Sequence, residues 1–188
     1  EVIIMDLNEV RRKIDLIDFR MVKLLEERME LALRAGMLKQ NAVDESREKQ
    51  VFENLRMHSS DLVDAAFVQK IWEEIIAESR NMQRKGLKLI GFQGEHGAYG
   101  EVAARTYNEA LVPIPCLEFA DVFDGVTEGK LSYGIVPVEN SLEGAVTQVN
   151  DLLIQTSLKI IGEVLIPIKH CLLALPDTDY REIKVVYS

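Results

Sequence analysis

The chain has 188 residues, 47% of them hydrophobic and 28% charged, a composition that suits one large or two small globular domains. Its formal net charge of −9 argues against nucleic acid as the main partner, because phosphate binding calls for a basic surface. No apolar run approaches the roughly 18 residues that a membrane span needs, and no secretory signal opens the chain, so the sequence predicts neither a membrane protein nor a secreted one.

Glycine and proline divide the chain into two halves. Residues 1–85 contain one glycine, Gly36, and no proline, whereas residues 86–188 contain the other ten glycines and all five prolines. This contrast predicts a helical domain over 5–85 and a turn-rich domain over 88–188. Met5 could be a natural start, and the four residues before it suggest a segment of a longer protein.

The first domain is predicted to form three helices. Either Asp6 or Asn8 can cap a helix that runs to about Lys39, and two shorter helices follow over 44–58 and 62–83. The first predicted helix would be roughly 50 Å long, which is too long for so small a domain to cover by itself. An intertwined dimer would bury it, and a solitary coiled-coil hairpin is the alternative. The apolar residues of the first helix follow a heptad spacing and form what we call the apolar ladder: Leu7, Val10, Ile14, Ile17, Met21, Leu24, Leu31, Ala35 and Leu38.

Polar residues interrupt the apolar face of each predicted helix. The heptad spacing calls for an apolar residue at position 28 of the first helix, where the chain has Arg28. Lys39 lies only about 20° around the helix axis from Arg28, on nearly the same face. In the second helix Asp44 and Glu48 continue into the apolar stripe, with Arg47 beside them. The third helix carries Ser79 and Gln83 on an i, i+4 row that begins at Phe67, Ile71 and Ile75.

Each interruption has a simpler structural explanation. The cations could extend their charged ends to water, Asp44 could favour the helix dipole, and the third stripe could fray at its end. Together, however, they describe one polar pocket inside a helical bundle. It holds cations, carboxylates, a hydroxyl and an amide, without a nucleophilic cysteine, a histidine or a metal-ligand spacing. Such a pocket suits a small polyanion and requires no cofactor and no metal.

The second domain shows alternating strands and helices, which predicts a mostly parallel sheet. Cys116 and Cys171 lie in its predicted strands, and two cysteines are too few for a disulfide scaffold, so a reducing cytoplasm is expected. Helices are predicted over 100–110, 120–129 and 144–155. The predicted strands are Lys88–Phe92, Pro115–Glu118, Tyr133–Val138, Ile160–Pro167, His170–Leu175 and Lys184–Tyr187.

Glycines follow the first of these strands at every third position, from Gly91 to Gly100. That spacing is not the dinucleotide-binding pattern, and a glycine-rich turn from strand to helix explains it equally well. The segment Pro137–Ser141 ends a predicted strand just before a helix, which is where α/β sheets bind anions. Neither segment identifies a ligand by itself.

Residues 7–83 resemble the all-helical chorismate mutase family, in the form that is fused to prephenate dehydratases. The resemblance therefore implies a multi-domain fold that begins with an all-α, intertwined three-helix domain. It is carried by Val10-Arg11-Arg12-Lys13-Ile14-Asp15 with Asp18, Leu24-Leu25-Glu26-Glu27-Arg28, Gly36-Met37-Leu38-Lys39, Asp44-Glu45-Ser46-Arg47-Glu48 and Glu78-Ser79 through Gln83.

The resemblance implies catalytic roles for residues of the predicted pocket. Arg28 and Arg11 would hold the two carboxylates of chorismate, with Arg11 supplied by the other subunit. Lys39 and Gln83 would donate hydrogen bonds to the ether oxygen whose bond breaks. The helix geometry is consistent with Arg11 coming from the other subunit. Arg11 lies some 25 Å along the helix from Arg28 and faces about 100° away, too far for one small metabolite to contact both in the same chain.

The remaining pocket residues would complete the substrate site. Glu48, as a further catalytic residue, and the backbone near Asp44 would address the ring hydroxyl, and Ser79 and Arg47 would orient the first contacts. The implied reaction is a one-step rearrangement to prephenate, which needs no acid, base or nucleophile. Folding the substrate lowers the entropic part of the barrier, and each well-placed donor supplies on the order of 3 kcal/mol.

Residues 88–188 resemble the first lobe of prephenate dehydratase, a partial α/β lobe like those of periplasmic binding proteins. The motifs are Gly91–Gly100, Val136–Gly144, Ile161-Gly162-Glu163, His170-Cys171-Leu172-Leu173 and Val186-Tyr187-Ser188. The resemblance implies that Gly97, Tyr99, Glu139, Asn140, Ser141, Gly144 and Ser188 bind substrate.

Because the family's second lobe is expected beyond Ser188, the sequence predicts that this chain makes prephenate without dehydrating it to phenylpyruvate. Chorismate and prephenate are thus the expected small-molecule partners, in phenylalanine biosynthesis. Two other interpretations remain at this point. The first half could be only a helical dimerisation module, and the second could be a regulatory lobe that binds an amino acid.

Overall fold

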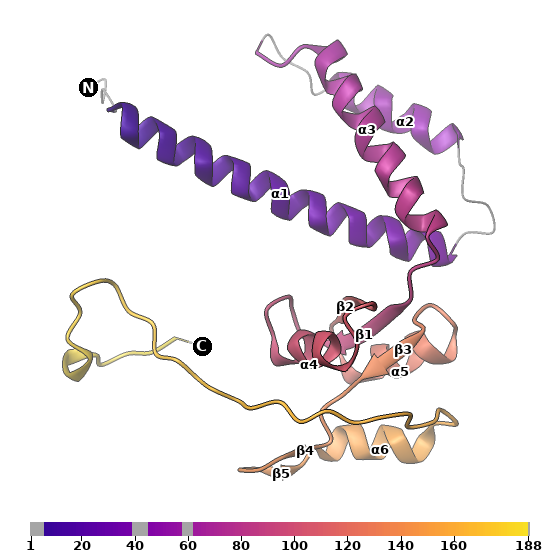
Figure 1. Ribbon diagram of the computed structural model, residues 1–188, viewed down its shortest axis with the longest axis vertical. Helices are drawn as coiled ribbons and strands as arrows, with labels where there is room; N and C mark the ends of the chain where they lie inside the picture. The colour runs from indigo at the N-terminus through magenta and orange to yellow at the C-terminus, as the bar shows by residue number, and fades with distance from the viewer. Residues whose placement is uncertain (1–5, 39–44, 58–61, 188) are drawn as a thin grey trace.

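The computed structural model describes residues 6–38, 45–57 and 62–187 (Figure 1). Its first half contains the helices α1 (Leu7–Leu38), α2 (Glu45–Met57) and α3 (Ala65–Arg84), as the sequence predicts. Asp6 caps α1, because its carboxylate accepts the backbone N–H of Glu9 at 2.8 Å. Asp64 caps α3 in the same way, accepting the N–H of Ala66 at 3.1 Å.

α3 contacts both of the other helices. α1 and α3 lie together near their C-terminal ends and diverge toward their N-terminal ends, while α2 runs along α3 (Figure 1). The N-terminal part of α1 is left uncovered: Leu7, Ile14, Ile17, Met21 and Leu24 are each at least half exposed. The apolar ladder predicted to pack therefore has no cover from the described part of this chain. None of the helices in the described ranges is long and apolar enough to cross a membrane.

The second half is built on a small parallel sheet in the order β2-β1-β3. β1 (Leu89–Gln93) is central, flanked by β2 (Val112–Cys116) and β3 (Tyr133–Ile135). Helices α4 (Tyr99–Tyr107) and α5 (Phe119–Thr127) pack against these strands. After them come a two-stranded hairpin of β4 (Glu139–Asn140) and β5 (Gly144–Ala145), the helix α6 (Thr147–Gln155) and a short 3₁₀ helix at Tyr180–Glu182.

The two halves share a hydrophobic cluster. Leu33 of α1, which is 5% exposed, packs with Leu89, Ile114 and Leu131 of the sheet domain. Met82 of α3 lies against the same cluster. The C-terminal part of α1 therefore contacts the sheet domain through Leu33, although Leu31 and Leu38 on the same part remain more than half exposed.

The sheet prediction was right for the first strand and wrong for several others. The second strand is Val112–Cys116, three residues earlier than predicted, and the third ends at Ile135. The segments 160–167, 170–175 and 184–187 are extended but form no strand among the described residues. A strand needs a hydrogen-bonded neighbour, and apolar side chains such as Leu165 and Leu173 are about nine-tenths exposed there.

The prediction that both cysteines lie in strands is confirmed for Cys116 and wrong for Cys171. Cys116 ends β2 and is half-buried, and burial raises the pKa of its thiol. Cys171 is exposed and lies outside any strand. The helix predicted from Gly144 begins only at Thr147, because Gly144 and Ala145 pair with the preceding strand.

Candidate active site in the helical domain

α1 and α3 approach each other closely at a glycine. A Cβ atom at Gly36 would lie 3.0 Å from Cγ of Gln83, so a larger residue here would require the Gln83 side chain to shift. The amide of Gln83 uses that room to donate a hydrogen bond to the backbone oxygen of Ala32 at 2.5 Å. A carboxamide has two N–H donors, so one remains for another acceptor.

One turn away, α1 and α3 are joined by Arg28 and Ser79. Nη1 of Arg28 donates to Oγ of Ser79 at 2.7 Å, and Ser79 donates in turn to the backbone oxygen of Ile75 at 2.8 Å. Ser79 is buried, and burial lowers the pKa of Arg28. A guanidinium that is partly desolvated and held by one neutral hydroxyl keeps its charge available for an anion.

The carboxylate of Glu48 on α2 faces the same helix from the other side. It forms an ion pair with Nη2 of Arg80, the residue that follows Ser79 on α3. Both side chains are about one-quarter to one-third exposed, at 26% and 32%. Arg28, Ser79 and Gln83 are thus brought together at the α1–α3 crossing, and Glu48 is held beside them by Arg80.

Other residues of the predicted pocket are placed differently. Arg11 is exposed on the uncovered part of α1, 17 residues before Arg28 in the same helix. Arg47 is also exposed, and its Nη1 lies 3.5 Å from Oε1 of Gln50. Lys39 and Asp44 lie outside the described residues.

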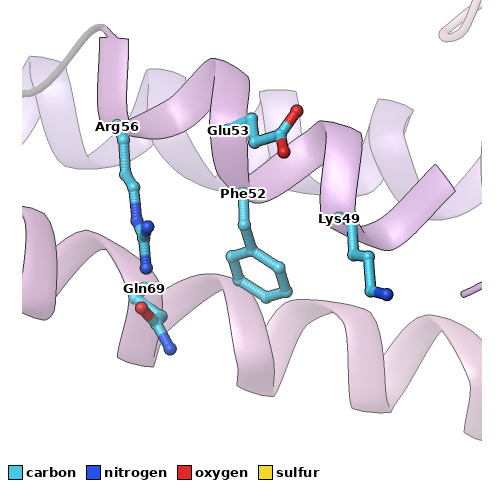
Figure 2. A pocket seen from close by; sticks show the side chains of 5 residues that line it. All are labelled: Lys49, Phe52, Glu53, Arg56 and Gln69. Carbon is cyan, nitrogen blue, oxygen red and sulfur yellow. The ribbon is translucent and has the colours of Figure 1, made fainter. Parts of the chain in front are cut away.

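A separate cavity of about 210 Å³ lies between α2 and α3 (Figure 2). Figure 2 shows the ring of Phe52 reaching from α2 toward α3, between Lys49 and Arg56, while Gln69 comes from α3. Glu53 completes the lining. The cavity shares no residue with the predicted pocket, so it is not the site that the sequence pattern describes.

In the sheet domain, the predicted ligand residues near α4 are already engaged. The N–H of Gly97 donates to the carboxylate of Glu101 at 2.9 Å. The hydroxyl of Tyr99 donates to the backbone oxygen of Lys169 and accepts its N–H, both at 2.8 Å. The glycine-rich segment is a turn from strand to helix, with positive φ at Gly94 and Gly97.

The second group of predicted ligand residues forms the β4–β5 hairpin. Glu139 and Asn140 pair with Gly144 and its neighbour, and the side chain of Asn140 accepts the N–H of Leu142 at 2.9 Å. Ser141 is exposed. Among the described residues no hydrogen bond joins this hairpin to Gly97 or Tyr99, and Ser188 lies outside the described range.

Two further polar clusters were missed by the sequence reasoning. Arg80 adjoins a residue of the polar stripe, and that adjacency is the only signal that could have singled it out. His96 lies between Glu30 of α1 at 2.8 Å and Glu101 of α4 at 3.2 Å, so it links the two domains. Nothing in the sequence near His96 points to Glu30, which is 66 residues away.

Comparison with protein families places this geometry in context. Residues 10–84 match the model of chorismate mutase type II, and residues 90–188 match that of prephenate dehydratase. The chain is therefore similar to two enzyme families, one over each half.

Known proteins carry the same pair of regions. The chain is 35% identical to a bifunctional chorismate mutase/prephenate dehydratase of Escherichia coli (strain K12), over 95% of this chain and 52% of the relative. Proteins of the same description from Aquifex aeolicus and from Buchnera aphidicola subsp. Schizaphis graminum are 33% and 32% identical, each over 97% of this chain. The chain spans about half the length of the curated relatives that it matches.

Proposed function

Because the chain belongs to the prephenate dehydratase family and carries a chorismate mutase type II domain ahead of it, we propose that its helical domain rearranges chorismate to prephenate. The proposed domains are 5–85 for the mutase and 88–188 for the first dehydratase lobe. The observation that carries the proposal is the cluster of donors at the α1–α3 crossing, where Arg28, Ser79 and Gln83 converge.

These donors suit a reaction that transfers no proton. Arg28 would bind one substrate carboxylate, and Ser79, its hydrogen-bond partner among the described residues, fixes the guanidinium without neutralising it. Gln83 is anchored by one N–H on Ala32, so its second N–H can address the ether oxygen as negative charge builds there. Lys39 is the second donor to that oxygen in the proposal. Glu48 and the backbone near Asp44 address the ring hydroxyl, and Arg47 helps to orient these contacts.

We propose that the active unit is a homodimer. The uncovered apolar residues of α1 would pack against a second copy, and that packing would carry Arg11 of one subunit to the site of the other. The two domains further suggest a cytoplasmic enzyme of phenylalanine biosynthesis, with chorismate and prephenate as its partners.

For the second half we propose a part of a prephenate dehydratase site, not the complete activity. There, Gly97, Tyr99, Glu139, Asn140, Ser141, Gly144 and Ser188 would contribute one wall of the site that converts prephenate to phenylpyruvate.

A direct assay tests the mutase proposal. The purified chain is mixed with chorismate, and loss of the substrate's ultraviolet absorbance is followed together with prephenate formation. Turnover above the rate without protein supports the proposal. Absence of turnover by a folded, dimeric chain favours the alternative, a helical dimerisation module whose charges only pair between helices.

A further inference from the structure

The ion pair between Glu48 and Arg80 joins two helices that carry proposed substrate contacts. Glu48 comes from α2 and Arg80 from α3, 32 residues later in the chain. Arg80 follows Ser79 directly, and Ser79 holds the guanidinium of Arg28 at 2.7 Å. Consecutive residues of α3 therefore contact both neighbouring helices, Ser79 contacting α1 and Arg80 contacting α2.

The charge of Glu48 needs a counterpart in this place. Chorismate carries two carboxylates, so a half-buried third carboxylate beside it would repel the substrate. The positive charge of Arg80 offsets the negative charge of Glu48. Its Nη2 contacts the carboxylate oxygen Oε1. Among the described residues no donor contacts Oε2, which leaves that oxygen free to accept a hydroxyl.

One hydrogen-bond donor of the Arg80 guanidinium is left unused, which is not expected of an ion pair that only holds two helices together. Its Nε–H is buried and has no hydrogen-bond partner among the described residues. An arginine that only fastened two helices would gain most from a two-point pair with the carboxylate, which uses every buried donor. An unsatisfied donor of this kind is costly and is typical of functional positions.

We infer that Arg80 is a positioning residue for the mutase reaction. It holds the carboxylate of Glu48 in place and offsets its charge, so that Oε2 can accept the ring hydroxyl of chorismate. The inference rests on the proposed mutase function, and it adds a residue to the set that the sequence pattern identified.

A double-mutant cycle on the full 188-residue chain tests the inference. Arg80→Met should lower kcat about tenfold, whereas in a Glu48→Gln background the same change should cost less than about twofold. Arg80→Lys should recover most of the loss, because it restores the charge beside Glu48. Arg84→Met serves as the matched control, since Arg84 is exposed one turn further along α3.

A binding measurement separates positioning from helix fastening. A stable bicyclic dicarboxylate that mimics the folded substrate is titrated by calorimetry in two forms, with and without the ring hydroxyl. Arg80→Met should weaken binding of the hydroxylated form about tenfold and leave the other form within about twofold. Equal losses for both forms, or equal losses of activity in both Glu48 backgrounds, would refute the positioning role while the mutase function stands. A wild-type chain that binds neither form and turns over no chorismate would overturn the function and the inference together.

Discussion

Arg28 is the residue on which the proposed chemistry depends most. Burial lowers the pKa of its guanidinium, and its hydrogen-bond partner among the described residues is the neutral hydroxyl of Ser79. Arg28→Ala should therefore leave the thermal midpoint unchanged or raised, while kcat/KM falls by about 10²–10³. Thermal unfolding and a chorismate assay measure the two effects. Arg20→Ala, at an exposed position of the same helix, is the control. An unfolded Arg28→Ala variant would favour a structural role for the hydrogen bond between Arg28 and Ser79 instead.

Gly36 tests the approach of Gln83 to α1. A methyl group at this position would lie 3.0 Å from Cγ of Gln83, so the amide must shift. Gly36→Ala should stabilise the helix by about 0.5–1 kcal/mol and yet lower turnover about tenfold. Denaturant unfolding and kinetics report the two changes. In a Gln83→Ala background the same substitution should cost no further activity, and an additive loss would mean that Gly36 acts by another route.

At the scale of elements, α1 is joined to α4 through His96. The side chains of Glu30 and Glu101, each 12% exposed, contact its two ring nitrogens, and they pair in turn with Arg34 and Arg105. Desolvation alone would lower the pKa of His96, but the hydrogen bonds and charges of both carboxylates raise it above its ordinary value of 6.5. Burial by itself would raise the pKa of Glu101. Hydrogen bonds from the backbone N–H of Gly97 and from the side chains of Arg105 and His96 outweigh that effect and lower the pKa to about 2.

These shifts predict how stability varies with pH. A raised histidine pKa stabilises the folded state below about pH 6.5, and the effect is lost as pH rises through the raised value. The lowered pKa of Glu101 also stabilises the folded state. This stabilisation is fully present above about pH 4.5 and is lost as pH falls through about 2. His96→Gln should therefore be less stable than the wild type at pH 6, with the gap narrowing toward pH 9.

Chemical unfolding across that range measures the gap. His170→Gln is the control, because the ring of His170 packs edge-on against Tyr99, 6.0 Å away, and forms no ion pair among the described residues. Parallel curves for the wild type and His96→Gln would show that the bridge between α1 and α4 does not titrate.

At the scale of the whole molecule, the uncovered N-terminal part of α1 predicts a shared active site. A chain with Arg11→Ala and a chain with Gln83→Ala should each keep only a small, measurable fraction of the wild-type activity alone. Mixed dimers should regain activity, because one site in each hybrid receives Arg11 from one chain and Gln83 from the other. Co-refolding the two chains and assaying the isolated hybrid measures this. Hybrids that stay inactive would contradict the supply of Arg11 from the second subunit.

A substitution on the same surface tests the dimer itself. Ile17 is 53% exposed in the single chain, and Ile17→Glu would place a charge where a second copy is proposed to pack. Sedimentation should then show a monomer with little mutase activity. The matched change is Lys23→Glu, at a residue whose Nζ contacts Glu26 and lies 5.9 Å from the ring centroid of Phe19, and it should leave the dimer intact.

The sequence by itself determined the three helices and the polar residues on their apolar faces. Helical periodicity and caps are local, so α1, α2 and α3 begin and end within a few residues of their predicted bounds. Arg28, Ser79 and Gln83 were identified because each breaks an apolar stripe. Only the tertiary structure decided which side chains meet across helices, as Glu48 does with Arg80 and Glu30 with His96, because such contacts depend on how the helices cross. It also decided that residues 160–175 form no strand, since β-propensity is local but a strand exists only where a neighbour supplies its hydrogen bonds.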